Sequence, residues 1–279
     1  MKHLLALMAL CVAFAAGAQV EPVGDLNDDG LVGVEDLMTL LSAFGNNYNE
    51  LNAHPDCVPI EYYGYTYEVI QIGSHCWFAE NLRTEIDRNG NPIPYIDDLT
   101  DWAAMEVFDA AQTIYEFNDS LLAIHGRLYT WNAAMQACPT GWELGWDTTP
   151  WFLLETEAGM PVTSIAGLWG RGMNSECGTN LLDESVDGNN TLGFNALLSG
   201  DVFYAPYDST AYFYGLNERT AFWTSTSAWN NFCQFSHELY MGGGLGRELL
   251  HPQFFDGVYR KGYPAKSGIS VRCSKYLGG

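Results

Sequence analysis

The chain has 279 residues, of which 34 are acidic and 12 basic, giving a formal net charge of −22. Such an acidic surface excludes nucleic acid and anionic membranes as expected partners, because both would be repelled, whereas it suits cations. The 9 Trp, 16 Tyr and 14 Phe residues, with only 16% charged residues, exclude a disordered chain, and the 29 glycines favour strands and ordered loops.

The first 18 residues have the pattern of a secretory signal peptide. Lys2 provides a positive start, residues 4–16 form an apolar run, and residues 16–18 are small, as a cleavage site requires. The run is shorter than the roughly 20 apolar residues of a membrane-spanning helix. We therefore expect a secreted or cell-surface (extracellular) protein that begins near Gln19 and does not insert into a membrane after cleavage.

Residues 25–36 match the twelve-residue pattern of a calcium-binding loop. Oxygen-bearing side chains occupy the first, third and fifth positions, a carboxylate occupies the last, and Gly30 permits the sharp turn between them. Ca²⁺ prefers oxygen ligands, and one main-chain carbonyl adds to this set. The sequence thus predicts Ca²⁺ as a cofactor. The expected ligands are Asp25, Asn27, Asp29, Leu31 (through its carbonyl) and Asp36.

A short amphipathic helix follows this loop. Leu37, Leu40, Leu41 and Phe44 recur at helical spacing, and Gly45 fits a helix end. Together, residues 19–45 resemble one repeat of a type I dockerin, which implies a calcium loop and helix, although dockerins pair two such units. The alternative is an acidic turn before the helix. A second stretch, 87–92, has a proline where the loop needs glycine, so we predict a plain turn there.

The remainder of the chain reads as one large domain. Residues 46–56 are polar and disfavour helix and strand, so we place a linker there and the domain at 57–279. Alternating aromatic and β-branched residues indicate strands, and one apolar run ends at a Cys-Pro pair as a helix would. The predicted elements are a strand or hairpin at 62–72, a helix at 129–137, and strands at 222–226 and 268–273.

The cysteines agree with export. An even number, spread widely, predicts three disulfides in an oxidising compartment. No Cys-x-x-Cys or Cys/His pair has metal-ligand spacing, so we expect no zinc site. Spacing alone leaves the pairing open. With Cys11 of the expected signal peptide set aside, the six cysteines of the mature chain are Cys57, Cys76, Cys138, Cys177, Cys233 and Cys273.

Seven short blocks stand out between residues 58 and 276. They are 72–82 (IGSHCWFAENL), 89–94 (NGNPIP), 126–131 (GRLYTW), 138–142 (CPTGW), 193–197 (GFNAL), 223–226 (WTST) and 270–273 (SVRC). In sequence and order these blocks resemble the Fibrobacter succinogenes major paralogous domain. One segment, 143–147, departs from the pattern of that family, which predicts a reshaped loop there.

These blocks are also similar to C-type-lectin-like and sulfatase-modifying folds. That resemblance implies an α+β, C-type-lectin-like domain with a twisted antiparallel sheet, short helices and long ordered loops. It also implies a disulfide between Cys138 and Cys273 that links a helix to the last strand. The pairing of the other four cysteines stays open.

The chain carries no sequence pattern of a serine hydrolase, zinc protease or nucleotide-binding enzyme. Acidic pairs such as 97–98 and 183–184 are expected by chance in so acidic a chain. We therefore expect no catalytic residues, and a non-catalytic, disulfide-stabilised module that binds glycans or cell-surface proteins. Candidate contacts are the loops at 183–190 and 229–231. The alternatives are a structural cell-envelope protein without a small ligand and a polysaccharide-active enzyme.

Overall fold

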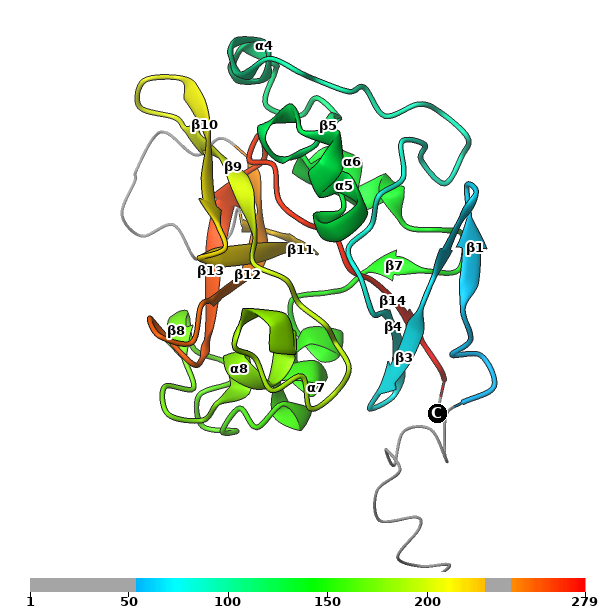
Figure 1. The fold of residues 1–279 in the computed structure, drawn as a ribbon, viewed down its shortest axis with the longest axis vertical. Coiled ribbons are helices and arrows are strands. Elements are labelled where there is room, and N and C mark those ends of the chain that lie inside the picture. The colour runs from blue at the N-terminus through cyan, green and yellow to red at the C-terminus, as the bar shows by residue number, and fades with distance from the viewer. Residues whose placement is uncertain (1–53, 229–241, 279) are drawn as a thin grey trace, which may run out of the picture. The chain divides into compact units, whose positions relative to one another are not determined.

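A computed structural model describes residues 54–228 and 242–278, all of which belong to the unit Ala53–Gly279. This unit combines sheets with short helices, so its class is α+β, as predicted (Figure 1). Within the described residues, no helix has both the length and the apolar character needed to span a membrane. The signal peptide, the calcium loop and its helix, and the segment 229–241 lie outside the described residues.

A hairpin of aromatic strands begins the domain. β1 (Ile60–Tyr62) and β2 (Tyr65–Tyr67) pair antiparallel through Tyr63 and Gly64, whose φ angles are +48° and +77°. Positive φ at both turn residues matches the twist of the paired strands, and glycine adopts it without strain. The predicted strand or hairpin is therefore confirmed, and it continues into β3 (Val69–Ile72).

Four antiparallel strands form one of the two larger sheets, in the order β3-β4-β14-β7. β4 (His75–Phe78) follows β3, β7 (Glu143–Leu144) comes from the middle of the domain, and β14 (Cys273–Tyr276) comes from its end. β14 lies between β4 and β7, with Ser274 of β14 opposite Trp77 of β4. The first and last parts of the domain are thus neighbours in one sheet (Figure 1).

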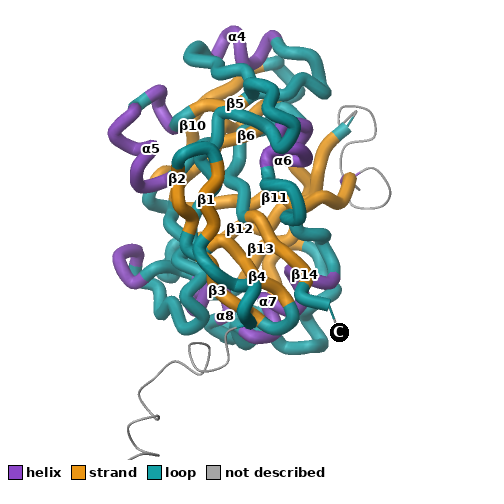
Figure 2. Tube along the Cα trace, turned by 90° about the vertical axis from the view of Figure 1, so that its right-hand side faces the viewer, coloured by secondary structure: helices purple, strands orange, loops and turns teal. Residues whose placement is uncertain are grey.

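The other large sheet has six strands in the order β10-β9-β11-β12-β13-β8. β9 pairs with β11 in parallel, and all other neighbours are antiparallel. Figure 2 shows β11, β12 and β13 in the middle of the domain. The strand predicted at 222–226 lies within β11. The bounds are β8 (Trp169–Arg171), β9 (Ser199–Ala205), β10 (Thr210–Leu216), β11 (Arg219–Ser227), β12 (Gly243–Leu250) and β13 (Val258–Pro264).

The strand predicted at 268–273 is only partly correct. Gly268, Ile269 and Ser270 form isolated bridges to β9, β6 (Leu128–Tyr129) and β11, and β14 starts only at Cys273. Each of these residues pairs with a different segment, so the chain crosses between sheets instead of extending one of them.

Short helices gather at two ends of the domain. α4, α5 and α6 lie at one end, and α7 and α8 lie at the other (Figures 1 and 2). The helix predicted at 129–137 starts two residues later, because Leu128 and Tyr129 pair with β5 (Gln112–Thr113), and it ends before Cys138 as predicted. The bounds are α4 (Leu99–Ala104), η1 (Tyr115–Phe117), α5 (Asp119–His125), α6 (Trp131–Ala137), α7 (Thr149–Glu157), α8 (Cys177–Leu181) and η2 (Glu184–Val186).

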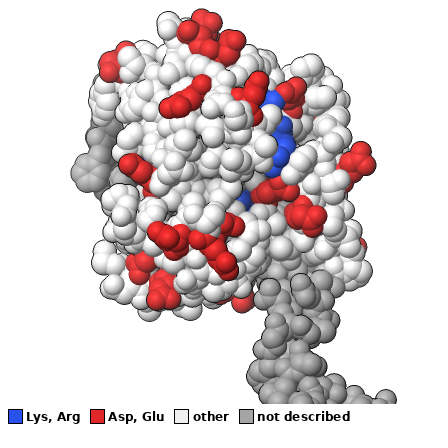
Figure 3. Space-filling model, in the orientation of Figure 1, with Lys and Arg blue, Asp and Glu red and all other residues white. Residues whose placement is uncertain are grey.

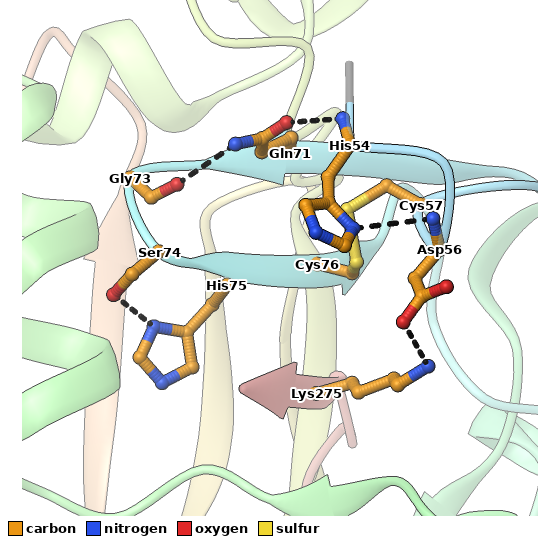
Figure 4. Close-up of a disulfide and its surroundings, with 9 residues drawn as sticks. All are labelled: His54, Asp56, Cys57, Gln71, Gly73, Ser74, His75, Cys76 and Lys275. Carbon is orange, nitrogen blue, oxygen red and sulfur yellow. Dashed lines mark hydrogen bonds and ion pairs between the residues drawn. A yellow bond between two sulfur atoms is a disulfide. The ribbon is translucent and has the colours of Figure 1, made fainter. Parts of the chain in front are cut away.

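Two disulfides crosslink the domain. Cys138 pairs with Cys273, which confirms the pairing implied by the resemblance and joins the end of α6 to the start of β14. Cys57 pairs with Cys76, joining the segment before β1 to β4 (Figure 4). The expectation of a bridge at Cys177 is wrong, because this residue is a buried free thiol.

The side chain of Cys177 is enclosed by apolar residues. The other cysteines of the described residues are bridged to one another, and Cys177 sits in an apolar cluster with its Sγ 3.4 Å from the Glu155 carbonyl. Burial raises the pKa of this thiol to about 12, so it stays protonated. Cys233 lies outside the described residues.

Candidate functional site

An open cleft of about 400 Å³ lies at one end of the six-stranded sheet. The turn between β10 and β11 is held to the loop after β12 by a 2.8 Å hydrogen bond from the His251 amide to the Glu218 carbonyl. The volume falls within the range of small-molecule sites in proteins. The lining residues are Tyr214, Glu218, Arg219, Glu248, Leu250, Phe254, Tyr259 and Lys261.

Strand register brings the charged residues of this cleft to one face of the sheet. Glu248 of β12 lies opposite Ala221 of β11 and Tyr259 of β13, and opposed residues share a face. Arg219 and Lys261 each stand two positions along their strands from these neighbours. Because side chains alternate along a strand, they point to the same face.

A network of charges lines this face. The Arg219 Nε donates to the Asp201 carboxylate at 2.8 Å, and its Nη1 lies 2.9 Å from one Glu248 oxygen. The Lys261 Nζ lies 2.6 Å from the other Glu248 oxygen. Burial raises the pKa of Asp201 to about 6, although the charge of Arg219 opposes this shift. These contacts hold the Arg219 and Lys261 side chains in place.

Aromatic rings form the walls of the cleft. Tyr214 is 46% exposed and Phe254 is 59% exposed, although both have large aromatic side chains of the kind that is usually buried. The Arg219 guanidinium lies 4.6 Å from the centre of the Tyr214 ring, and Tyr259 packs against Phe255 with ring centres 4.8 Å apart. The cleft therefore combines partly exposed aromatic rings with fixed hydrogen-bonding groups, and the Arg219 guanidinium covers one face of the Tyr214 ring.

The opposite face of the same sheet carries a buried ion cluster. Asp147 accepts hydrogen bonds from Arg247 and Arg260, and Glu155 accepts them from Arg171 and Arg247. The carboxylate–guanidinium bonds from Arg171 are 2.7 and 2.8 Å long. All five residues are buried, so the cluster crosslinks α7 to β8, β12 and β13 and is not open to a ligand.

Asp147 is the last residue of the segment 143–147, for which the sequence predicts a reshaped loop. Residues 143–144 form β7, and Asp147 is the third residue after the end of that strand. Burial alone would raise its pKa, but the hydrogen bonds and charges of Arg260 and Arg247 lower it below the usual value. The loop after β7 thus supplies one of the two carboxylates of the ion cluster.

A second hollow, of about 320 Å³, is lined by residues of the sequence blocks that suggested the family. Arg272 is buried there and donates to the Asn81 side chain at 2.8 Å and to the Asn195 carbonyl at 3.0 Å. Desolvation lowers the pKa of Arg272 to about 9. These polar groups already join three segments, and the lining includes no aromatic side chain. The lining residues are Glu68, Ala79, Glu80, Asn81, Ile124, Asp183, Asn195, Leu197 and Arg272.

The structure places only some of the residues singled out in the sequence. The calcium ligands and the loop at 229–231 lie outside the described residues. The loop at 183–190 reaches the second hollow through Asp183 and does not line the cleft. Within the described residues, no group of three or more His, Cys, Asp or Glu side chains could hold a metal ion.

The acidic pairs and the predicted turn have local structural roles. Asp98 caps α4 by accepting from two backbone amides, and Asp183 caps η2 by accepting from the Ser185 amide. Asp87 accepts from the Asn89 and Asn91 amides, at 2.8 and 2.9 Å, and so closes the plain turn predicted at 87–92.

The cleft itself was missed by reasoning from the sequence. Its walls come from strands that are far apart in the chain, and only the alternation of Tyr212 and Tyr214 in β10 hinted at an aromatic face. Alternation predicts a shared face but does not say whether that face is exposed.

The sheets, the two disulfides and the cleft define a crosslinked α+β domain made mostly of antiparallel strands. A family model described as the Fibrobacter succinogenes major domain matches residues 70–275, and the chain belongs to that family. No curated protein and no solved structure matches the chain.

Proposed function

We propose that the domain is a non-catalytic module that binds carbohydrate in the cleft at the end of the six-stranded sheet. The observation that carries the proposal is the pairing of exposed rings, Tyr214 and Phe254, with side chains held by ion pairs, Arg219 and Lys261. Sugar rings present apolar C–H faces and a rim of hydroxyls. Aromatic faces suit the former because of their negative quadrupole, and fixed polar groups suit the latter.

The arrangement of carboxylates favours binding over hydrolysis. A glycosidase needs two carboxyl groups that face each other across the substrate, one of them a proton donor. Asp201 has the raised pKa of a donor, but it is 1% exposed and does not line the cleft. Of the two carboxylates that line the cleft, Glu248 is already paired with Arg219 and Lys261. The other, Glu218, is exposed to water, so neither has the enclosed and unpaired setting of a proton donor.

Binding to a glycan array, followed by calorimetry with the retained sugars, tests this proposal. Tyr214→Ala should weaken binding about ten-fold, or about 1.4 kcal/mol, because it removes an exposed ring. Tyr276→Ala is the matched control, since Tyr276 is 55% exposed on β14, in the other sheet. An array without a retained glycan, or equal binding by both variants, would refute the proposal. Hydrolysis of a retained sugar by the protein would show instead that the domain is an enzyme.

We further propose that the protein is exported and resides outside the cell, either secreted or at the cell surface. The signal-peptide pattern of the first 18 residues supports this, as do the two disulfides, because such bonds persist in oxidising compartments. Amino-terminal sequencing of the protein from its natural source should begin at Gln19. A retained Met1 would contradict export by cleavage.

The loop at 25–36 is proposed to bind Ca²⁺ through Asp25, Asn27, Asp29, the Leu31 carbonyl and Asp36. The spacing of oxygen ligands around Gly30 supports this. Calorimetric titration of the full chain with CaCl₂ should give one binding event that Asp29→Ala abolishes. Heat that persists in this variant would assign the ion to another site.

A relation to C-type-lectin-like folds is also proposed. The bridge from Cys138 to Cys273 supports it, since it ties the end of a helix to the terminal strand as the resemblance implies. A crystal structure that superimposes on such a fold over both sheets would establish it, and a different strand order would refute it.

A further inference from the structure

We propose that the ligand is a neutral polysaccharide chain that extends out of the cleft across β10, so that Tyr212 provides a second sugar-binding position. This inference rests on the proposed carbohydrate binding and deepens it. The sugar chain would be uncharged and polymeric, and it would run from the cleft towards the edge strand β10.

Tyr212 continues the aromatic wall of the cleft along β10. It stands two residues from Tyr214, so both side chains point to the same face of the sheet. Their ring centres are 6.4 Å apart, and they are 44% and 46% exposed. Phe203 of β9 lies opposite Tyr212 with ring centres 5.3 Å apart and supports it from the side.

The strand order leaves this aromatic line open at its outer side. β10 is the edge strand of the six-stranded sheet, so no further described strand pairs beyond Tyr212. Four strand spacings separate β10 from β13, which carries Tyr259, or roughly 19 Å at about 4.8 Å each. A single sugar ring is too short to contact both strands, whereas a chain of sugars can do so.

The charges of the cleft and of the surrounding surface disfavour an anionic ligand. Both cations of the cleft are already paired, Arg219 with Asp201 and Glu248, and Lys261 with Glu248. Glu218 adds an exposed negative charge at the rim. The chain as a whole carries −22, and acidic side chains are spread over the face drawn in Figure 3. Carboxylated or sulfated polysaccharides would be repelled by this surface.

Calorimetry with ladders of cello-, xylo- and manno-oligosaccharides, from the monosaccharide to the hexasaccharide, tests the inference with the full chain. For the ladder that binds, affinity should rise with length. Tyr212→Ala should lower the affinity for the hexasaccharide about five-fold and leave the affinity for the disaccharide unchanged. Tyr214→Ala should weaken both lengths.

Two controls separate stacking from folding and charge. Tyr212→Phe keeps the ring and should bind the hexasaccharide as the wild type does, with the wild-type melting temperature. Tyr212→Ala should stay folded, with a slightly lower melting temperature because the ring contact with Phe203 is lost. Polygalacturonate, an acidic polymer, should not bind.

Two results would overturn the inference while leaving carbohydrate binding intact: equal hexasaccharide affinity in Tyr212→Ala and wild type, or tighter binding of polygalacturonate than of any neutral ladder. If none of the ladders and no arrayed glycan binds, the proposed function itself fails, and this inference fails with it.

Discussion

The two disulfides should stabilise the domain to different degrees, because they close loops of very different length. Cys138 and Cys273 are 135 residues apart, and Cys57 and Cys76 are 19 apart. The loss of chain entropy on crosslinking gives about 5 kcal/mol for the longer loop and about 3 kcal/mol for the shorter one. Replacing each pair by alanine should therefore separate the two variants by about 2 kcal/mol.

The comparison is well matched, because the two pairs are similarly buried. Cys76, Cys138 and Cys273 are fully buried and Cys57 is 8% exposed, so the cost of removing sulfur atoms nearly cancels in the difference. Urea unfolding followed by tryptophan fluorescence suits the measurement. All nine tryptophans stand at residue 77 or later, so the signal reports on the crosslinked domain and not on the calcium loop.

The reduced wild-type protein is the control for packing. It keeps all sulfur atoms but has no crosslink, and its unfolding free energy should lie below that of either double variant. Equal losses in the two alanine variants, or a larger loss for Cys57→Ala/Cys76→Ala, would refute the entropic reasoning.

Three further outcomes are expected. Asp147→Asn should cost roughly 3–5 kcal/mol in urea unfolding, because it leaves Arg260 buried without its carboxylate and removes one of the two carboxylates that pair with Arg247. The pKa of Asp147 is lowered in the folded state, so its contribution to stability is present above the unfolded value of 3.8 and is lost as pH falls through the folded value. The variant should lack this loss of stability in acid. The raised pKa of Asp201, about 6, predicts the opposite slope: its contribution is complete below pH 3.8 and is lost as pH rises through 6, so Asp201→Asn should flatten the stability curve in that window. Iodoacetamide at pH 8 should leave the peptide that contains Cys177 unmodified until the domain is unfolded in urea, and labelling of the native protein would contradict its burial.

Local patterns predicted the elements whose partners are near in sequence. The aromatic alternation from 62 to 72 forms a hairpin because the turn residues permit it, and α6 ends where Pro139 stops any helix. The bridge between Cys138 and Cys273 followed from the resemblance. Residues 268–270 did not form the predicted strand, because three different segments pair with them in turn.

Sites built from distant strands could not be predicted in this way. The cleft needs Tyr214, Arg219, Glu248 and Lys261 on one face, which depends on the register between strands and not on any local pattern. The same holds for the ion cluster, where Asp147 and Arg247 are 100 residues apart. Alternation along a strand says which residues share a face, but packing decides which face meets water.

The position of β14 has a consequence for how the domain is made. A polypeptide that emerges amino end first presents β3, β4 and β7 long before β14 exists. Until residues 273–276 arrive, β4 and β7 each keep an open edge and Cys138 has no sulfur to join. The four-stranded sheet cannot be assembled strand by strand during translation, because β14, which pairs with both β4 and β7, is synthesised after the other three strands. The four-stranded sheet therefore cannot be completed until residues 273–276 have been synthesised.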